Sequence, residues 1–247
     1  MPCLGKNMGA AIDLVVLAGG AATRLGPLAG QGPKALLPVH GRPFLTWPLA
    51  RIAGTIPLGR VFISARAGQA QAFHAGAKMW PHETVILEET APMGTGGAIL
   101  AARAHAAPGN PFLVLNGDVY FNLDAGALVQ AALRHGAALS AIAVPDSRRF
   151  GRLDIVAGRV RAFVEKMPAP EPTPGLVNAG LYAFCHESLA GFPCRPCAFE
   201  HEIAPVLAAM GVLGAVTASG PFLDIGTPEA YARAETLIEN TALCACA

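Results

Sequence analysis

The sequence carries little charge and almost no excess of one sign over the other. Only 14% of its 247 residues are charged, and 18 basic against 17 acidic residues leave a formal net charge of +1. Duplex-binding proteins usually need a basic surplus to neutralise phosphates, so we expect no nucleic-acid partner. The hydrophobic fraction of 53% also excludes a disordered chain, which needs low hydrophobicity and high net charge. We expect a single domain over 1–247 with a large buried core.

The sequence also lacks a membrane span and an export signal of the usual kind. Residues 203–223 contain no Asp, Glu, Lys or Arg, and a spanning helix needs about 20 apolar residues. Proline and glycine interrupt this run, which predicts a helix ending near Met210, a buried strand over Val212–Thr217 and then a turn. Asp13 lies inside the apolar run near the N-terminus, so we expect a cytoplasmic protein without a membrane partner.

Cysteines are present, but their spacing is weak support for a metal site. Cys194 and Cys197 have the C-x2-C spacing of a zinc half-site, and Cys244 with Cys246 are candidates for the other half. Structural zinc sites usually combine two such close pairs, whereas the second pair here is a C-x-C near the C-terminus. We therefore expect reduced thiols, with zinc at the first pair as the alternative.

In the first half of the chain, short apolar runs alternate with stretches of helical length. The runs are rich in β-branched residues, as strands buried on both faces of a parallel sheet are. This βαβ series predicts an α/β, doubly wound, Rossmann-like sheet with its ligand at the carboxyl ends of the strands. The strands are expected at Ile12–Leu17, Val61–Ser64, Thr84–Leu87 and Phe112–Leu115, and the helices at Pro43–Gly54, Ala67–Met79, Thr95–Ala106 and Asp124–His135.

After His135 the strands come closer together and alternate more between polar and apolar residues. This texture is typical of antiparallel pairs joined at tight turns, such as Ala157-Gly158. We therefore predict a mixed sheet with a small antiparallel insertion. The strands are expected at Leu139–Val144, Arg152–Val156, Val160–Glu165 and Leu176–Phe184.

Glycines directly follow the first predicted strand. Gly19 and Gly20 allow backbone N–H groups to approach phosphate oxygens, because no Cβ lies between them. Arg24 and Lys34 follow and can neutralise a polyphosphate. The G-x-G-x-x-G spacing and the G-K-[ST] ending of the best-known phosphate loops are both missing. The pattern predicts a triphosphate site, with an ordinary glycine turn as the alternative.

Two aspartates follow separate predicted strands. Asp118 comes shortly after the fourth strand, and Asp224 follows the last apolar strand. Mg²⁺ typically takes one or two protein carboxylates and completes its shell with phosphate oxygens and water, so the pair predicts a magnesium site. Alternatively, each aspartate caps the next helix, as Asp224 would for a helix beginning near Pro228.

Lysine is scarce, and Lys166 is one of only four. It follows Glu165, and Asn178 comes soon after. A compact ammonium group suits point contact with a phosphate in a narrow site. The alternative for Lys166 is a solvated strand end.

Taken in order, these motifs resemble those of the sugar-1-phosphate nucleotidyltransferases. The resemblance extends from about residue 12 to residue 240. Within that family, the sequence is most similar to the D-glycero-D-manno-heptose 1-phosphate guanylyltransferases. The motifs are Leu17-Ala18-Gly19-Gly20-x-x-Thr23-Arg24-Leu25 with Pro33-Lys34, Met93-Gly94-Thr95-Gly96-Gly97, Asn116-Gly117-Asp118, Phe150-Gly151-Arg152, Glu165-Lys166, Asn178-x-Gly180 and Asp224-Ile225-Gly226-Thr227-Pro228.

The resemblance implies an enzyme that joins an NTP and a sugar 1-phosphate into an NDP-sugar and releases pyrophosphate. GTP and D-glycero-D-manno-heptose 1-phosphate are the expected substrates, in nucleotide-sugar biosynthesis for cell-surface polysaccharide. The alternatives are guanylyl transfer to mannose 1-phosphate, uridylyl or thymidylyl transfer to N-acetylmuramate or glucose 1-phosphate, and a regulatory subunit without turnover. A monomer and a homo-oligomer are both open. The implied parts bind nucleotide (about 11–136) and sugar (about 137–227) and end in a helix (about 228–240).

The resemblance also implies a role for each motif. Arg24 would hold the β- and γ-phosphates and Lys34 the α-phosphate, while Lys166 steers the sugar phosphate. Mg²⁺ is the expected cofactor, on Asp118 and Asp224. The nucleotide is expected to contact Leu17, Ala18, Gly19, Gly20, Thr23, Glu89 and Gly94, and the sugar phosphate to contact Gly151, Glu165, Lys166 and Asn178.

For the base, Glu88 or Glu89 occupies the expected stretch after the third strand. A carboxylate only accepts hydrogen bonds, which suits the adjacent N1–H and N2–H donors of guanine better than the single N–H of uracil. One departure is Ala22, where the family usually has Gly. If this position requires a positive φ, Ala would cost about 1–2 kcal/mol and weaken nucleotide binding; the alternative is that the loop is compatible with Ala.

Overall fold

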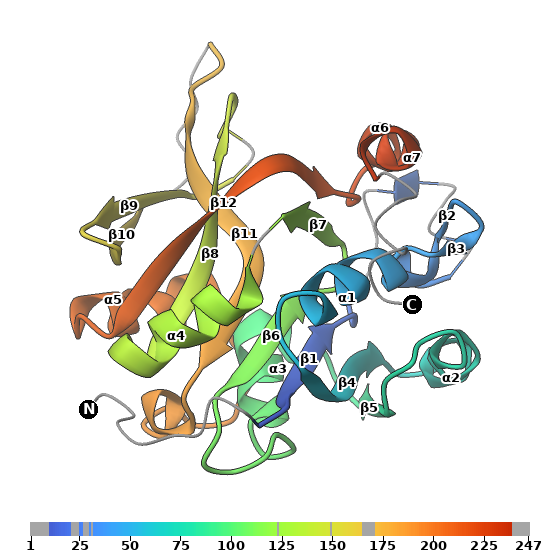
Figure 1. The fold of residues 1–247 in the computed structure, drawn as a ribbon, viewed down its shortest axis with the longest axis horizontal. Coiled ribbons are helices and arrows are strands. Elements are labelled where there is room, and N and C mark those ends of the chain that lie inside the picture. Colours follow the sequence, from blue (N-terminus) through green and yellow to red (C-terminus); the bar gives the residue numbers. More distant parts are fainter. Residues whose placement is uncertain are drawn as a thin grey trace.

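The polypeptide forms one mixed sheet with helices on both faces (Figure 1). Within the described residues, the sheet contains ten strands. The predicted α/β, doubly wound fold with an antiparallel extension is confirmed. The computed structural model describes residues 10–20, 25–26, 30, 32–122, 124–148, 150–164 and 171–238.

One half of the sheet is parallel, and its strands end at the same edge. Its strands are β1 (Ile12–Leu17), β4 (Leu58–Arg66), β5 (Thr84–Glu89) and β6 (Phe112–Asn116). β1 lies between β4 and β6, and β5 pairs with the far side of β4. The register places Leu17 of β1 opposite both Ser64 of β4 and Asn116 of β6. Backbone and side chains at these carboxyl ends therefore share one edge.

The two faces of the sheet bury separate cores, because successive side chains of a strand point to opposite sides. Leu14 and Val16 of β1 pack in one core, and Val15 packs in the other. The first core contains side chains of α1, α2 and α4, and the second contains those of α3 and α5. These helices are α1 (Thr46–Ala53), α2 (Ala70–Ala77), α3 (Gly94–Ala102), α4 (Ala125–His135) and α5 (Ala204–Ala209).

The other half of the sheet is largely antiparallel. It consists of β8 (Ala137–Val144), β9 (Arg152–Val156), β10 (Arg159–Val164), β11 (Gly175–Phe184) and β12 (Leu213–Asp224). β11 joins the halves by pairing antiparallel with β6 on one side and β8 on the other. The predicted hairpin β9–β10 is confirmed, with positive φ at Ala157 and Gly158. β8 pairs with β11 and β12 rather than with this hairpin, because those two strands occupy both its edges.

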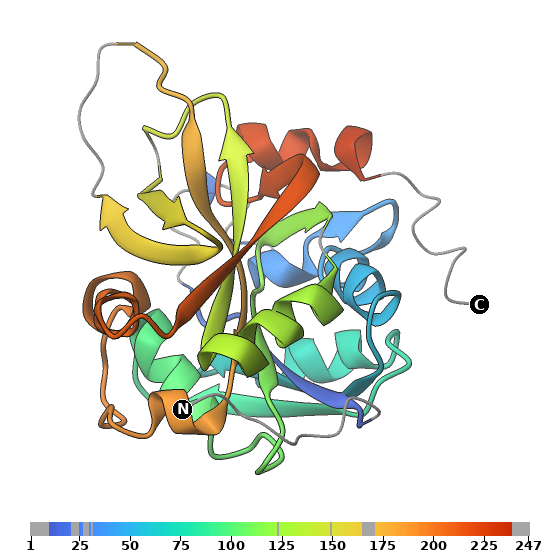
Figure 2. The same cartoon turned by 60° about the vertical axis from the view of Figure 1, so that its left-hand side comes forward.

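The uncharged run 203–223 forms α5 and most of β12. The helix ending near Met210 is confirmed, but the turn expected after Thr217 is wrong, since the strand continues to Asp224. β12 pairs with β8 as far as Ala218 and then changes partner. The Gly-Pro pair therefore marks a change of partner and not the end of the strand (Figure 2). No helix among the described residues is long and apolar enough to cross a membrane.

Several short elements were not predicted from the sequence. β7 pairs with the end of β12, and the hairpin β2–β3 contributes to a third buried cluster with Trp47, Tyr120 and Ile225. The helix expected over about 228–240 is divided at Arg233 into α6 and α7, and residues 239–247 lie outside the described part. The short elements are β2 (Pro38–Val39), β3 (Arg42–Pro43), β7 (Val119–Asn122), α6 (Pro228–Ala232), α7 (Ala234–Leu237), the 3-10 helices η2 (Lys34–Leu36) and η3 (His186–Leu189), and the π-helix η4 (Phe199–Ile203).

Candidate active site

A cleft of about 610 Å³ lies at the carboxyl ends of the parallel strands. This is the edge at which a doubly wound sheet binds its ligand. The end of each parallel strand contributes to the lining, and the first turn of α3 completes it. The predicted site residues that line the cleft are Leu17, Gly19, Gly20, Glu89, Gly94 and Asp118.

Glycine at the end of β1 permits close packing around the cleft. A Cβ on Gly19 would lie 3.0–3.1 Å from the carboxylate atoms of Glu89. A Cβ on Gly117 would lie 3.0 Å from the carbonyl oxygen of Leu17, which accepts the Gly117 N–H at 2.9 Å. Ala18 follows β1 and donates its N–H to the backbone carbonyl oxygen of Ser64 at 2.8 Å. Backbone groups at the end of β1 therefore form this side of the cleft, and hydrogen bonds to neighbouring strands hold them in place.

The structure separates the two candidate base-reading carboxylates. Glu89 lines the cleft, where its Oε1 accepts the hydroxyl of Ser64 at 2.5 Å. Glu88 is exposed and accepts the backbone N–H of Gly68 at 2.6 Å. Neighbouring residues of a strand point to opposite faces, so only one of them can face the cleft. Glu89 is the residue so placed.

Lys34 and Asp118, 84 residues apart in sequence, form an ion pair at the cleft. Lys34 Nζ donates to Asp118 Oδ2 at 2.5 Å, with side-chain exposures of 15% and 24%. Lys34 lies in η2, and Asp118 lies between β6 and β7. The fold therefore brings together the lysine predicted to hold the α-phosphate and a carboxylate predicted to bind metal.

Asp224 lies beside Asp118 because β7 and β12 pair there. Asp224 is opposite Val119 in the register, and Ile225 donates its N–H to the carbonyl oxygen of Asp118 at 2.9 Å. The alternative role of Asp224 as a helix cap is wrong, since Thr227 caps α6 by accepting the Ala230 N–H at 3.3 Å.

The donor set at this point fits a magnesium ion. Asp118 and Asp224 offer carboxylate oxygens from adjacent strand ends, which Mg²⁺ prefers as ligands. Among the described residues, no three His, Cys, Asp or Glu side chains are grouped as a site built by protein alone would require. A substrate phosphate would have to supply part of the shell, as is usual for Mg²⁺.

The wall of the cleft at α3 is closed by the segment that contains Cys197. The carbonyl oxygen of Cys197 accepts the N–H groups of Gly96 and Gly97 at 3.0 and 3.3 Å, and its own N–H donates to Met93 at 3.0 Å. Gly94 has a φ of +66°, and a Cβ there would lie 2.5 Å from the Cys197 oxygen. Cys194 is exposed. These contacts show a backbone clip over the start of α3.

The predicted sugar-phosphate residues that the structure describes do not line this cleft, and the others lie outside the described residues. Gly151 precedes β9 and Asn178 is in β11, and neither is among the described residues that line the cleft. The roles expected of these residues stay predictions. Thr23, Arg24, Glu165 and Lys166 lie outside the described residues, as does Ala22.

Sequence reasoning missed three side chains that the fold brings to this region. Ser64 holds Glu89, and Tyr182 and Glu200 both accept hydrogen bonds from Asn178 Nδ2. None of the three belongs to a motif in the sequence. Only Ser64 had a signal in the sequence: it is a polar residue that directly follows the apolar run of β4, near the end of the strand.

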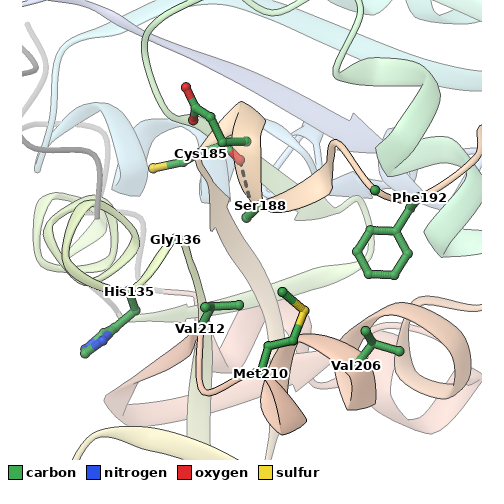
Figure 3. A pocket seen from close by; sticks show the side chains of 10 residues that line it. His135, Gly136, Cys185, Ser188, Phe192, Val206, Met210 and Val212 are labelled. Atoms are coloured by element: carbon green, nitrogen blue, oxygen red, sulfur yellow. Dashed lines mark hydrogen bonds between the residues drawn. The ribbon is translucent and has the colours of Figure 1, made fainter. Parts of the chain in front are cut away.

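A second, smaller cavity of about 310 Å³ lies away from the predicted residues (Figure 3). It is lined mainly by apolar side chains from the end of α4, the region of η3 and the end of α5, including Val206 and Met210. Ser188 Oγ donates to the carbonyl oxygen of Cys185 at 2.7 Å, which satisfies that hydroxyl within the protein. No predicted site residue lines this cavity.

The sequence matches the nucleotidyl transferase family over residues 14–241. It is 36% identical over 233 residues to a mannose-1-phosphate guanylyltransferase of Mycobacterium tuberculosis, covering 90% of this chain and 63% of the relative. It is 30% identical over 226 residues to a putative mannose-1-phosphate guanyltransferase of Sulfolobus acidocaldarius, covering 90% and 62%. The chain thus spans less than two thirds of the length of these relatives.

Solved structures share the fold. HddC from Yersinia pseudotuberculosis matches with a TM-score of 0.78 at 30% identity, over 92% of this chain and 100% of HddC. The same values hold for HddC complexed with GMP-PN. A putative glucose-1-phosphate thymidylyltransferase from Bacillus anthracis has a TM-score of 0.77 at 22% identity, over 93% of this chain and 96% of its own.

We predict that Gly94→Ala destabilises the protein through the wall of the cleft. A positive φ disfavours a side chain by about 1–2 kcal/mol, and the new Cβ would meet the Cys197 oxygen. Urea denaturation should show a free energy of unfolding lower by about 2 kcal/mol or more. Gly191→Ala is the matched control, since its Cβ would enter open space, and should change stability by less than about 0.5 kcal/mol. Equal stability of the two variants would contradict the assigned packing.

Proposed function

Because this chain belongs to the nucleotidyl transferase family, we propose that it is a sugar-1-phosphate guanylyltransferase. It transfers GMP from GTP to a sugar 1-phosphate of manno configuration, giving a GDP-sugar and pyrophosphate. The family predicted from the motifs is confirmed. The observation that carries the proposal is a single cleft lined by Glu89, by Asp118 and by the glycines after β1, with Lys34 paired to Asp118.

Guanine is favoured over the other bases by chemistry and by relatives. Glu89 offers an acceptor-only carboxylate in the cleft, which matches the paired N1–H and N2–H donors of guanine. The M. tuberculosis and S. acidocaldarius relatives carry names of guanylyl-transferring enzymes, and HddC was solved with GMP-PN. These relatives support GTP as the nucleotide.

Two sugars fit the proposal, and both have manno configuration. The relatives in sequence are named for mannose 1-phosphate, and the motifs resemble enzymes for D-glycero-D-manno-heptose 1-phosphate. The heptose differs from mannose by one additional carbon on the exocyclic chain. A recognition site for the ring hydroxyls would therefore be common to both. We place the reaction in the cytoplasm, where GTP is available, as a supply of activated sugar for cell-surface polysaccharide.

The reaction requires positioning and charge neutralisation more than acid–base catalysis. An oxygen of the sugar phosphate attacks the α-phosphorus of GTP, and the bond from that phosphorus to the oxygen bridging to the β-phosphate breaks. Pyrophosphate leaves with the electron pair. The attacking oxygen is already anionic, so no side chain has to remove a proton. Holding both substrates in line in one cleft supplies much of the rate enhancement.

Lys34 would neutralise charge at the α-phosphate, where the new bond forms. Its ion pair with Asp118 fixes the ammonium group at the cleft before a ligand binds. Asp118 and Asp224 would hold Mg²⁺, which neutralises charge on the phosphate oxygens when bound. The two aspartates come from strand ends that the β7–β12 pairing keeps adjacent. The protein thus brings a cation for the phosphates and two carboxylates for the metal together before a ligand binds.

The activity is tested by a matrix of four NTPs against mannose, heptose, glucose and N-acetylated amino-sugar 1-phosphates. We expect Mg²⁺-dependent pyrophosphate release only when both substrates are present, with GTP and a manno sugar giving the highest kcat/KM. Reactions without Mg²⁺ or without the sugar phosphate are the controls. Release that is fastest with UTP or dTTP would overturn the choice of base, and no release in any combination would overturn the proposal.

We predict that Glu89→Gln weakens the preference for guanine. The amide oxygen can still accept the Ser64 hydroxyl, but the charged acceptor for guanine is lost. The kcat/KM for GTP should fall about 10-fold or more, while that for UTP falls less. Glu88→Gln is the matched control, because this neighbouring side chain contacts Gly68 instead of the cleft. An equal effect of the two substitutions would contradict the assignment of Glu89.

We predict that Asp118→Asn and Asp224→Asn each lower kcat far more than nucleotide affinity. Loss of a carboxylate at the phosphates should reduce kcat by about 100-fold or more, and a higher Mg²⁺ concentration should be needed for half-maximal rate. Asp154→Asn, on an exposed strand position, is the control. Initial rates across a Mg²⁺ titration, with GTP binding measured separately, check this. Normal rates at normal Mg²⁺ would remove these residues from the metal site.

A further inference from the structure

Asn178 is already fully engaged in hydrogen bonds as a donor. Its Nδ2 donates to the Tyr182 hydroxyl at 2.7 Å and to Glu200 Oε1 at 2.8 Å, and its Oδ1 accepts the Gly180 N–H at 3.1 Å. A side-chain amide has only two N–H groups. Both are used here, so Asn178 has no hydrogen left to donate to a substrate hydroxyl.

Glu200, by contrast, has acceptor capacity to spare. It is an exposed residue of η4, and within the described part of the chain its Oε1 accepts one hydrogen bond, from Asn178 Nδ2. An ionised carboxylate has about four lone-pair sites on its two oxygens. The remaining sites can accept hydrogen bonds from two neighbouring hydroxyl groups, which a sugar ring provides.

Backbone contacts place Glu200 next to the wall of the cleft. The preceding residue, Phe199, is buried and donates its N–H to Thr95 Oγ1 at 3.1 Å. Thr95 lines the cleft at the start of α3. The same segment is clipped to α3 through Cys197. Glu200 therefore follows directly on a residue anchored to the cleft.

A second connection runs through Tyr182. Asn116 lines the cleft and lies close enough to Tyr182 to affect its pKa, and the Asn116 Oδ1 is a buried acceptor with no hydrogen-bond partner among the described residues. Burial raises the pKa of Tyr182, and the charges of Glu200 and Asp118 raise it further. The phenol thus stays protonated between the two carboxylates. The buried Tyr182 side chain therefore connects Glu200 to the proposed reaction centre at Asp118.

A bulge in β11 makes this arrangement possible. The register with β8 shifts between Asn178 and Tyr182, and Gly180 has a φ of +89°. A Cβ on Gly180 would lie 2.7 Å from Asn116 Nδ2. Glycine therefore lets the cleft residue Asn116 approach β11 where Asn178 and Tyr182 meet.

We propose that Glu200 recognises the sugar, accepting hydrogen bonds from hydroxyl groups of the sugar 1-phosphate. Asn178, which the sequence resemblance assigned to the sugar, is then a positioning residue that orients the Glu200 carboxylate. This inference rests on the proposed function and names a specificity residue for it. Hydrogen bonds to a carboxylate are stronger than those to a neutral acceptor, so Glu200 would select for sugars with hydroxyl groups at the matching positions.

The test is Glu200→Gln with mannose 1-phosphate and GTP as substrates. The amide oxygen can still accept from Asn178, so the thermal midpoint should stay unchanged. The KM for mannose 1-phosphate should rise about 10-fold or more, while the KM for GTP changes by less than about twofold. Glu200→Asp keeps the charge but shortens the side chain, and should raise the KM for mannose 1-phosphate less.

Monodeoxy analogues of mannose 1-phosphate distinguish recognition from support of the fold. The unmodified enzyme should lose kcat/KM for the analogue lacking the recognised hydroxyl, and Glu200→Gln should show no such loss between that analogue and mannose 1-phosphate. Glu202→Gln is the matched control on the same element. Glu202 pairs with Arg195 and accepts the Ala198 N–H, and its substitution should leave both KM values within about twofold.

The outcomes separate the two proposals. Turnover by the unmodified enzyme with an unchanged sugar KM in Glu200→Gln overturns the role of Glu200 alone. A larger effect of Glu200→Asp than of Glu200→Gln overturns it as well, because the charge would not be what matters. Absence of turnover by the unmodified enzyme across the whole substrate matrix overturns the proposed function itself.

Discussion

The candidate site depends on the register of the parallel strands, which aligns their carboxyl ends at one edge of the sheet. Hydrogen bonding places the last residue of β1, Leu17, opposite Ser64 and Asn116 on its two neighbours. A shift of one residue would turn each side chain to the other face of the sheet. Ser64 would then no longer reach Glu89, and the two cores would exchange their apolar residues. Pairing of the backbone therefore sets both the stability of this half and the content of the cleft.

The antiparallel half is attached to this edge through β11 and β12. β11 pairs with β6, and its bulge carries Asn178 and Tyr182 close to Asn116. β12 runs parallel to β8 and then pairs with β7, which delivers Asp224 beside Asp118. The groups proposed to face the phosphates thus lie at the parallel half of the sheet, and one of the two carboxylates proposed to hold metal arrives on a strand from the other half.

Local sequence pattern was sufficient for much of the fold but only part of the site. Strands such as Ile12–Leu17 and the helix from Asp124 follow from apolar runs and capping chemistry, which act over a few residues. The change of partner in β12 was not predictable, because Gly220-Pro221 has the same local signal as a turn. Lys34 and Asp118 were singled out by motif, whereas their contact is a tertiary property. Glu200 belongs to no motif, because the role proposed for it follows from the hydrogen bond that it accepts from Asn178 in the folded protein.

The contact between the Cys197 segment and α3 restricts substitution differently in its two partners. On one side, Cys197 holds α3 through its own N–H and carbonyl groups, which every residue type except proline provides in full. On the other, Gly94, Gly96 and Gly97 have no room for a Cβ, since each would lie 2.5–2.7 Å from an atom of the clip. Substitutions that keep the backbone of this segment therefore preserve its hydrogen bonds to α3, whereas a side chain at any of the three glycines would collide with the segment. The close fit against α3 thus restricts Gly94, Gly96 and Gly97 by side-chain size, while the hydrogen bonds across it depend on the Cys197 backbone.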